Sequence, residues 1–421
     1  MESTTQNVEK GIEPQVLIFI ILTGILTSIG FGIITPVAPF LISRYVSDPN
    51  QAGIVLGWLT SIFAICQFLS APALGALSDK YGRRAILLLC ILGSAIGFLL
   101  LGLGGALWVL FLGRIIDGIT GANMSVTFAF IADVTPPGQR GKFFGMMGAI
   151  MGIGFLVGPA VGGVLARFGV VIPFYAAAAL TFVNVLYGFF FMPESLPKEK
   201  RSQLKMAALN PFSALANVLS IPPLRWLLVA IFLYTVPFAA LSVNISLLAK
   251  DNLHWDAAGI GVIFASVGIT DILVQGLLLQ VLMHNFGESA VAIGGLILEI
   301  VGYILMASVV LVLSPIPMMV GTIVLAMGDG LLGPSLNGLL SGAAGAEAQG
   351  QVQGGNQSMQ SLARIIGPFV GGLMYVNMGH ASPFLSGVFI TLLAIAAIMV
   401  ARPKVNRFAP LNEQSAPPNL V

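Results

Sequence analysis

The chain has 421 residues, of which 57% are hydrophobic and only 9% are charged. Soluble domains carry about 25% charged residues, so this chain cannot cover a globular surface with polar groups and is predicted to lie in lipid. The net charge of +2 is too small to indicate a nucleic-acid partner. The two cysteines lack ligand spacing, and there is no phosphate-binding GxxxxGK[ST] loop, so we predict no metal, no cofactor and no enzyme activity.

Twelve apolar runs follow one another along the chain. A bilayer core about 30 Å thick is crossed by roughly 20 helical residues. The runs reach that length and lack the alternation of membrane strands, so they are predicted to be helices. The predicted spans are 15–43, 52–78, 85–104, 106–132, 141–166, 172–192, 224–249, 257–283, 288–313, 315–342, 353–378 and 381–401.

The basic residues predict how the chain is oriented. An even number of spans puts both termini on one side, and most of the 19 Lys and Arg residues fall in loops on that side. The positive-inside rule therefore makes both termini cytoplasmic. The longest break between spans also carries the densest positive run, at 193–205. We expect an N-terminal bundle at 1–193, a central loop at 194–222, a C-terminal bundle at 223–402 and a disordered tail at 403–421.

The two halves repeat. The stretch GPAVGG at 158–163 returns as GPFVGG at 367–372, and DGITG at 117–121 returns as DGLLG at 329–333. The nearly constant separation indicates duplication, so we expect two pseudo-symmetric six-helix bundles. Such repeats form transporters with a site near the middle of the membrane, between the halves.

Charge gathers in the stretch GALSDKYGRR at 75–84, between the second and third spans. Gly75 is expected to allow close helix approach and Gly82 to permit a tight turn. Membrane topology alone accounts for the cations Arg83 and Arg84. Asp79 is not explained in that way, and we expect it to meet a helix N-terminus or to pair across the halves as a latch.

Three stretches carry a family resemblance. GALSDKYGRRAILL resembles the cytoplasmic-loop signature of the major facilitator superfamily, and LGRIIDGITGA resembles the signature of its fourth helix. GIGFLVGPAVGG resembles the fifth-helix signature of its drug–proton antiporters. The chain is most similar to the twelve-helix group that includes tetracycline/proton antiporters. This resemblance implies a monomeric exporter in the bacterial inner membrane that exchanges protons for a lipophilic small molecule.

The resemblance also implies roles for residues outside the membrane centre. Asp79 and Arg83 would take part in a cytoplasmic gate, with Asp133 as a charge partner within or between the halves. A second set would form a helix bend and a close-packed seam against the eleventh span: Gly158, Pro159, Gly162 and Gly163, with Gly367 and Pro368 at the repeat positions. A proline within a span frees a backbone carbonyl and permits a kink.

Six charged residues lie inside spans, where each is a functional candidate because charge in lipid is costly. They are Arg114, Asp117, Asp271, Glu299, Asp329 and Arg364. Arg114 and Asp117 share a helix face, as a structural ion pair or as a proton-coupling site; the resemblance links the matching arginine to proton transfer. The three other acids are candidate proton carriers. Arg364 could neutralise one of them or contact substrate.

The chain departs from the tetracycline antiporters at positions where that group carries acids, which here are Thr27 and Gly97. The departures put tetracycline itself in doubt as a substrate. Four polar residues in signature helices are candidate pocket residues besides Arg364: Asn123, Thr127, Gln357 and Gln360. Two alternatives to an exporter stay open, namely a facilitator or proton symporter that imports a small metabolite, and a membrane sensor that transports nothing.

Overall fold

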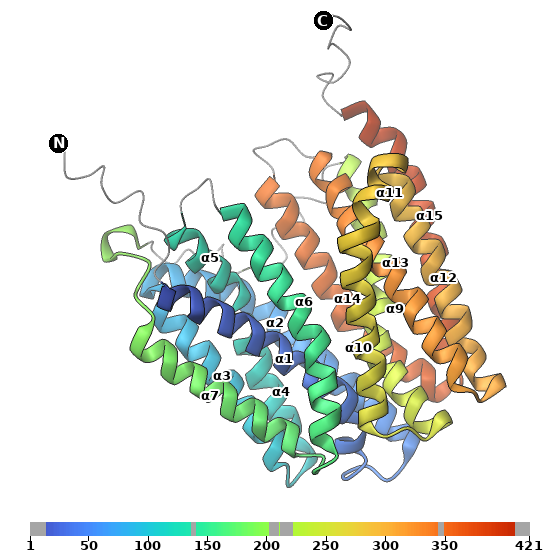
Figure 1. Cartoon of the computed structure of the whole chain (residues 1–421), viewed down its shortest axis with the longest axis horizontal. Coiled ribbons are helices and arrows are strands. Elements are labelled where there is room, and N and C mark those ends of the chain that lie inside the picture. Colours follow the sequence, from blue (N-terminus) through green and yellow to red (C-terminus); the bar gives the residue numbers. More distant parts are fainter. Residues whose placement is uncertain (1–13, 136–139, 202–209, 211–221, 344–348, 409–421) are drawn as a thin grey trace, which may run out of the picture.

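The computed structural model describes residues 14–135, 140–201, 210, 222–343 and 349–408, and all regular secondary structure within them is helical (Figure 1). The first half contains α1 (Pro14–Ile42), α2 (Pro49–Tyr81), α3 (Arg83–Leu103), α4 (Leu107–Gly121), α5 (Met124–Val134), α6 (Arg140–Ala166), α7 (Ile172–Phe191) and the short 3-10 turn η2 (Lys198–Lys200). The second half contains α9 (Pro222–Leu253), α10 (Ala257–Leu273), the π-helical turn η4 (Val274–Leu278), α11 (Leu279–Phe286), α12 (Glu288–Val312), α13 (Pro315–Gly342), α14 (Gln349–Asn377) and α15 (Ser382–Phe408).

Each predicted span falls on one helix or on consecutive helical segments. The fourth span is divided into α4 and α5, and the Gly121 carbonyl freed by this break accepts a hydrogen bond from Gln67 Nε2 at 3.0 Å. The eighth span is divided into α10, η4 and α11. Helix α15 continues to Phe408, into the segment predicted as a tail; most of the predicted central loop and residues 409–421 lie outside the described residues.

Ten helices in the described ranges are long and apolar enough to cross a membrane. Helix α6 supplies only a shorter apolar stretch, Ile150–Ala166. Helix α14 does not qualify by composition, because its first half reads QGQVQGGNQSMQS. It packs against α2 and α9, so neighbouring helices shield part of its surface from lipid.

The packing of the second half repeats that of the first. In the first half α1 packs on α6 and α7, α3 packs on α4 and α7, and α2 packs on α4. In the second half α9 packs on α14 and α15, α12 packs on α13 and α15, and α10 packs on α13. Two large contacts join the halves, α2 with α14 and α6 with α10. These two contacts are equivalent under the repeat, as expected for an all-α fold of two pseudo-symmetric bundles.

The bundles meet at one end of the molecule, which we call the Lys250 end because Lys250 Nζ there donates to Ser43 Oγ of the other bundle at 2.5 Å. Backbones approach closely towards this end. A Cβ built on Gly57 would lie 2.7 Å from the Pro368 carbonyl oxygen, and one on Gly163 would lie 2.6 Å from the Ala257 carbonyl oxygen.

The bundles separate towards the opposite end, which we call the Arg83 end (Figure 1). In the described part of the chain, no heavy atom outside the helix itself lies within 4 Å of a Cβ built on Gly75 in α2 or on Gly152 in α6. The close helix approach predicted at Gly75 is therefore absent in this structure. Among the described residues, the helices of the two bundles approach closely towards the Lys250 end and diverge towards the Arg83 end (Figure 1).

The small-residue seam of α6 is real, but its predicted partner is wrong. Gly158 and Gly162 pack on α1, where built Cβ atoms would lie 2.8 Å from the Ile29 carbonyl oxygen and 2.7 Å from that of Ile33. Helix α6 packs on α1 and α10 rather than on the eleventh span, α14. Helices α6 and α14 are equivalent under the repeat, and each packs on the helix equivalent to the other's partner: α6 on α10 and α14 on α2. Gly367 correspondingly packs on the α9 backbone at Val236.

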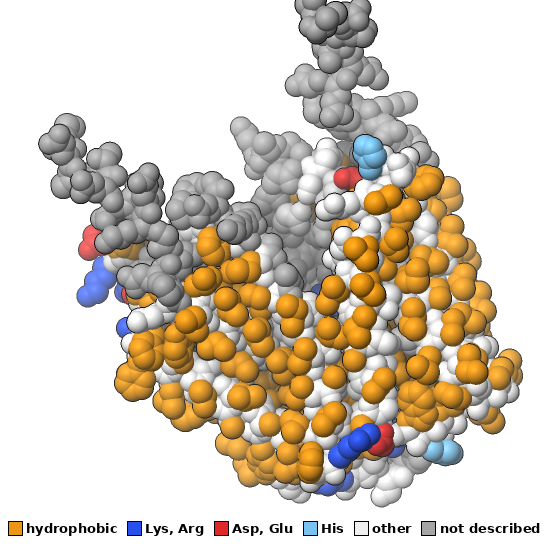
Figure 2. Space-filling model, viewed as in Figure 1, with side chains coloured by type: hydrophobic (Ala, Val, Ile, Leu, Met, Phe, Trp, Pro, Cys, Tyr) orange, Lys and Arg blue, Asp and Glu red, His pale blue; other side chains and the backbone are white. Residues whose placement is uncertain are grey.

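The outer surface agrees with a lipid environment. The face in Figure 2 is largely hydrophobic through its middle, and charged side chains gather near its ends. Large apolar side chains are exposed around the bundles, including Phe190 on α7 and Ile304 on α12. Such a surface would aggregate in water and is stable in a bilayer.

Candidate functional site

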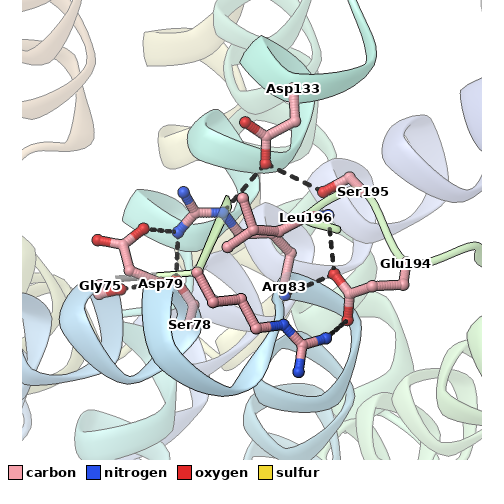
Figure 3. A network of polar contacts seen from close by, with 9 residues as sticks. Gly75, Ser78, Asp79, Arg83, Asp133, Glu194, Ser195 and Leu196 are labelled. Atoms are coloured by element: carbon pink, nitrogen blue, oxygen red, sulfur yellow. Dashed lines mark hydrogen bonds and ion pairs between the residues drawn. The ribbon is translucent and has the colours of Figure 1, made fainter. Parts of the chain in front are cut away.

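Arg83 organises a polar network at the Arg83 end of the first bundle (Figure 3). Its Nη1 lies 2.5 Å from Asp79 Oδ1 and donates to Ser78 Oγ at 2.6 Å. Its Nε lies 3.2 Å from Asp133 Oδ2, which also accepts a hydrogen bond from Ser195 Oγ at 3.1 Å. Only 11% of the Arg83 side chain is exposed. The cation is held directly by α2 and α5, and the segment after α7 supports it through the bond from Ser195 to Asp133.

Glu194 supports the same network from the backbone side. Its Oε1 accepts the backbone N–H of Arg83 at 2.8 Å and that of Leu196 at 3.1 Å, which places a carboxylate at the N-terminus of α3. Gly82 precedes this helix with φ 106°, a conformation that disfavours a side chain. A Cβ on Gly82 would also collide with the Glu194 carboxylate. The predicted tight turn at Gly82 is present.

Among the residues that the structure describes, the latch predicted across the halves is not formed. Asp79 and Asp133 both pair with Arg83 inside the first bundle. Arg84 is also bound within that bundle, since its Nη2 donates to the Phe189 carbonyl oxygen. The bundles are separated at this end, so in this conformation the partners of the gate residues come from one half.

Arg114 and Asp117 form a buried ion pair in α4. Arg114 Nη1 lies 3.1 Å from Asp117 Oδ2, and Arg114 Nε donates to the Leu59 carbonyl oxygen at 3.3 Å. The guanidinium carbon also lies 4.0 Å from the ring centroid of Phe63. The two side chains are 4% and 7% exposed. The pair is neutral as a unit and is fully enclosed by the first bundle and its neighbours.

Gly97 makes room for this pair. A Cβ built on Gly97 would lie 2.7 Å from Asp117 Cβ, because α3 and α4 cross there in close contact. Thus the glycine in the predicted third span and the acid in the predicted fourth span face each other. Position 97 of α3, where the tetracycline antiporters carry an acid, is a glycine here, and Asp117 of α4 lies directly against it.

Three acids converge in the second bundle around Asp329 of α13. Gly328 and Gly330 flank Asp329, and each gives space to an acid from another helix. A Cβ on Gly328 would lie 3.0 Å from Glu299 Cγ of α12, and one on Gly330 would lie 2.8 Å from Asp271 Oδ1 of α10. The sequence GDG therefore brings three helices' carboxylates to one level of the bundle.

Glu299 is the most enclosed of these acids, with 0% exposure. Neither of its carboxylate oxygens has a hydrogen-bond partner within the described residues, nor does the buried hydroxyl of Tyr303 one turn later. Asp271 is only partly buried; its Oδ1 accepts a hydrogen bond from Gln275 Nε2 at 2.9 Å, beside the π-helical turn η4. A π turn inside a helix is often found at functional sites.

Arg364 of α14 has an exposed side chain. It interacts electrostatically with Asp329 and with Tyr234 of α9, and no ion pair within 4.0 Å joins it to an acid in the part of the chain that the structure describes. Arg364 is therefore an exposed cation on α14 that interacts with Tyr234 and Asp329 of its own bundle.

The four polar pocket candidates divide into two groups. Asn123 and Thr127 are buried, and Thr127 Oγ1 donates to the Asn123 carbonyl oxygen at 3.1 Å, so both sit at the break between α4 and α5. Gln357 is exposed on α14. Gln360 Nε2 donates to Asn356 Oδ1 at 3.0 Å. Gln357 and Arg364 are therefore the predicted substrate residues that are open to solvent here.

Several residues of these networks were not among the predicted candidates. Ser78 and Glu194 belong to the Arg83 network, and Tyr234 and Tyr303 lie beside the acids of the second bundle. Of these four residues, only Glu194 could have been found from the sequence, because it is an acid directly after the sixth predicted span. The tyrosines are ordinary in membrane helices, so only the packing of α9, α12 and α13 identifies them.

Comparisons with known proteins agree with this arrangement. A family model described as Major Facilitator Superfamily matches residues 20–269 and 227–420. The chain is 34% identical to the class C tetracycline resistance protein of Escherichia coli, over 84% of this chain and 88% of that protein. It is 29% identical to multidrug resistance protein 2 of Bacillus subtilis, over 96% and 100%.

A solved structure supports the same fold. The crystal structure of the human organic anion transporter MFSD10 superposes with a TM-score of 0.69 at 26% identity and covers 92% of this chain and 100% of that one. A match of this extent includes both bundles. Together with its apolar helices, this identifies the chain as a multi-pass membrane protein that belongs to the Major Facilitator Superfamily.

Proposed function

We propose that this protein is a proton-coupled exporter of lipophilic drug-like molecules that works by alternating access in the bacterial inner membrane. The main support is the similarity to a tetracycline resistance protein and a multidrug resistance protein over most of the chain. The two bundles would be the domains 1–193 and 223–402, and both termini would face the cytoplasm. On this assignment the Arg83 end would be the cytoplasmic end, and the structure would correspond to an inward-open state.

In this state a substrate would enter from the cytoplasm and reach α14. Gln357 and Arg364 are exposed there, and the Arg83 network holds α2, α3 and α5 together within the first bundle. Rocking of the bundles would open the glycine contacts at the Lys250 end and bring Gly75 and Asp79 towards the second bundle. The latch predicted for Asp79 would form in that second state.

Proton coupling is assigned to the acids of the second bundle, with Arg114 and Asp117 as a second candidate site. Among the described residues, the enclosed Glu299 carboxylate has no hydrogen-bond partner. Such a carboxylate costs roughly 2.5 kcal/mol or more in lipid if it is charged. Binding a proton removes that cost. Proton release would become favourable when rocking admits water or moves a cation such as Arg364 closer.

The proposal is tested by transport in everted membrane vesicles from an efflux-deficient host. An inwardly acidic pH gradient should drive accumulation of a fluorescent lipophilic cation or of tetracycline, and added drug should release protons from the vesicles. Collapse of the gradient should abolish accumulation. Glu199→Gln, a surface acid, is the matched control for Glu299→Gln. Transport only in the import direction would replace the exporter by a facilitator or symporter, and absence of any flux would favour a sensor.

A further inference from the structure

A second cavity lies apart from the space between the bundles. It has a volume of about 620 Å³ and is bounded by the start of α3, the end of α7 and the segment that follows α7. Helices α3 and α7 pack on each other and on the first bundle, and neither shares a substantial contact with the second bundle. The cavity is therefore on the outer side of the first bundle, at its Arg83 end, and is not part of the transport path described above.

Cations dominate the polar lining of this cavity. Arg84, Lys198 and Arg201 line it, against one carboxylate, that of Glu194. Glu194 is already engaged by two backbone N–H groups, and its Oε2 lies 3.7 Å from Arg201 Nη2, a long distance for an ion pair. This carboxylate cannot neutralise the three cations, so an anion would be favourable in the cavity.

Donor groups of the lining remain available. Arg201 Nε is buried and has no hydrogen-bond partner within the described residues. Lys198 forms no ion pair with any described residue. A buried donor without a partner is costly, about 1–3 kcal/mol, and a phosphate oxygen would satisfy it. Arginine and lysine side chains around one point are the usual protein ligands of a phosphate.

The other wall of the cavity is apolar. Leu88, Leu196 and Phe189 line it, and Phe189 is 60% exposed at the outer surface. The next residue, Phe190, is 72% exposed on the same helix. A small hydrophilic anion gains nothing from such a wall, whereas an amphiphile would place its phosphate among the cations and its chains along α7. Basic pockets between membrane helices at the cytoplasmic side suit anionic lipid head groups.

We propose that this cavity is a binding site for an anionic phospholipid, with the phosphate held by Arg84, Lys198 and Arg201 and the acyl chains lying along the exposed phenylalanines of α7. A free phosphate compound shares the phosphate chemistry but not the apolar contact. Because Glu194 contacts both Arg201 and the first amide of α3, the site adjoins the Arg83 network.

The test measures phosphatidylglycerol bound to the full-length protein in detergent by native mass spectrometry. The cavity variant is Lys198→Gln with Arg201→Gln. The control is Lys80→Gln with Arg225→Gln, which removes the same charge from two exposed residues outside the cavity. At about 1 kcal/mol for each basic residue near an anionic head group, we expect roughly thirtyfold weaker binding for the cavity variant. The control should bind like the unchanged protein.

A second variant keeps all charges. Ala85 is exposed and lines the cavity, so the ring of Ala85→Phe should narrow it beside Arg84 and weaken phosphatidylglycerol binding even if the charge variant fails to fold. Equal loss in the cavity and control variants, or undiminished binding in Ala85→Phe, would overturn the proposal. Displacement of the lipid by millimolar inorganic phosphate would assign the site to a free phosphate compound instead. Retention of phosphatidylglycerol against inorganic phosphate, with loss in both cavity variants, would support the lipid.

Discussion

The two bundles place charge at their centres in different ways. In the first, Arg114 and Asp117 lie on one helix, touch at 3.1 Å and form a neutral unit. In the second, Asp271, Glu299 and Asp329 come from three helices, and Arg364 stays beyond ion-pair distance of any described acid. A duplicated scaffold thus holds one centre in which a cation and an acid are paired, and another in which three acids lie without a cation at ion-pair distance among the described residues. Under the proposed function, the first centre would stabilise its bundle and the second would exchange protons.

The largest effect on stability is expected from a substitution that breaks the Arg114–Asp117 ion pair. Arg114→Leu leaves Asp117 buried without its cation and should destabilise the protein by about 3–5 kcal/mol. The double variant Arg114→Leu with Asp117→Leu should recover most of that loss, because an apolar pair needs no compensation. Thermal unfolding in detergent measures both. If the double variant is as unstable as the single one, the pair does more than neutralise itself.

The next effect concerns the space around Asp329. Gly328→Ala should cost about 1–3 kcal/mol, because its Cβ would lie 2.6 Å from the Gly295 carbonyl oxygen and force α12 away from α13. Gly333→Ala in the same helix is the control, since no heavy atom lies within 4 Å of its Cβ position. Equal stability of the two variants in thermal unfolding would mean that the three acids are not held by close helix contact.

Glu299→Gln should abolish proton-coupled transport while leaving the stability of the protein nearly unchanged. The carboxylate makes no hydrogen bond to a described residue, so the change in the free energy of unfolding should be below about 1 kcal/mol. Proton release on addition of drug should nevertheless disappear, since an amide side chain does not bind and release a proton as a carboxyl group does. Asp117→Asn, measured beside it, should retain some coupling if the second bundle is the proton site. Full coupling in Glu299→Gln would reverse the assignment.

Asp79→Asn is expected to have the smallest effect on stability. The Asp79–Arg83 pair is four residues apart and 43% of the Asp79 side chain is exposed, so about 0.3–0.5 kcal/mol is expected. The efflux rate in vesicles should fall by a larger factor than this small loss of stability explains. The reason is that the latch would form only in the other conformation. Unchanged efflux would remove Asp79 from the gate and leave it as a partner of Arg83.

Periodicity and repeats predicted much of this molecule, for identifiable reasons. Apolar length set the helices, and the motifs containing Gly158 and Gly367 marked equivalent positions in the two halves. The turn at Gly82 followed from its place between two spans. The helices that pack against the glycines of α6 could not be predicted, because a sequence repeat does not indicate which helix of the opposite bundle comes closest.

The candidate site was predictable only as a set of residue types. Placing Arg114 beside Asp117 needed no more than helical spacing. Asp271, Glu299 and Asp329 come together through contacts among α10, α12 and α13. These contacts cannot be predicted from the positions of the spans along the sequence. Glu194 was hidden for another reason: it lies in a segment that reads as a basic loop, although its carboxylate supports the start of α3.

The polar composition of α14 has a consequence for biogenesis. A segment as rich in glutamine, glycine and serine as 349–361 enters hydrocarbon poorly by itself, because each unshielded amide carries a transfer cost. Its neighbours α2 and α9 are both synthesised before it. We therefore expect this helix to leave the translocon late, inserting only once those earlier helices offer it a groove, so that truncation after residue 343 should yield a stable intermediate in membranes.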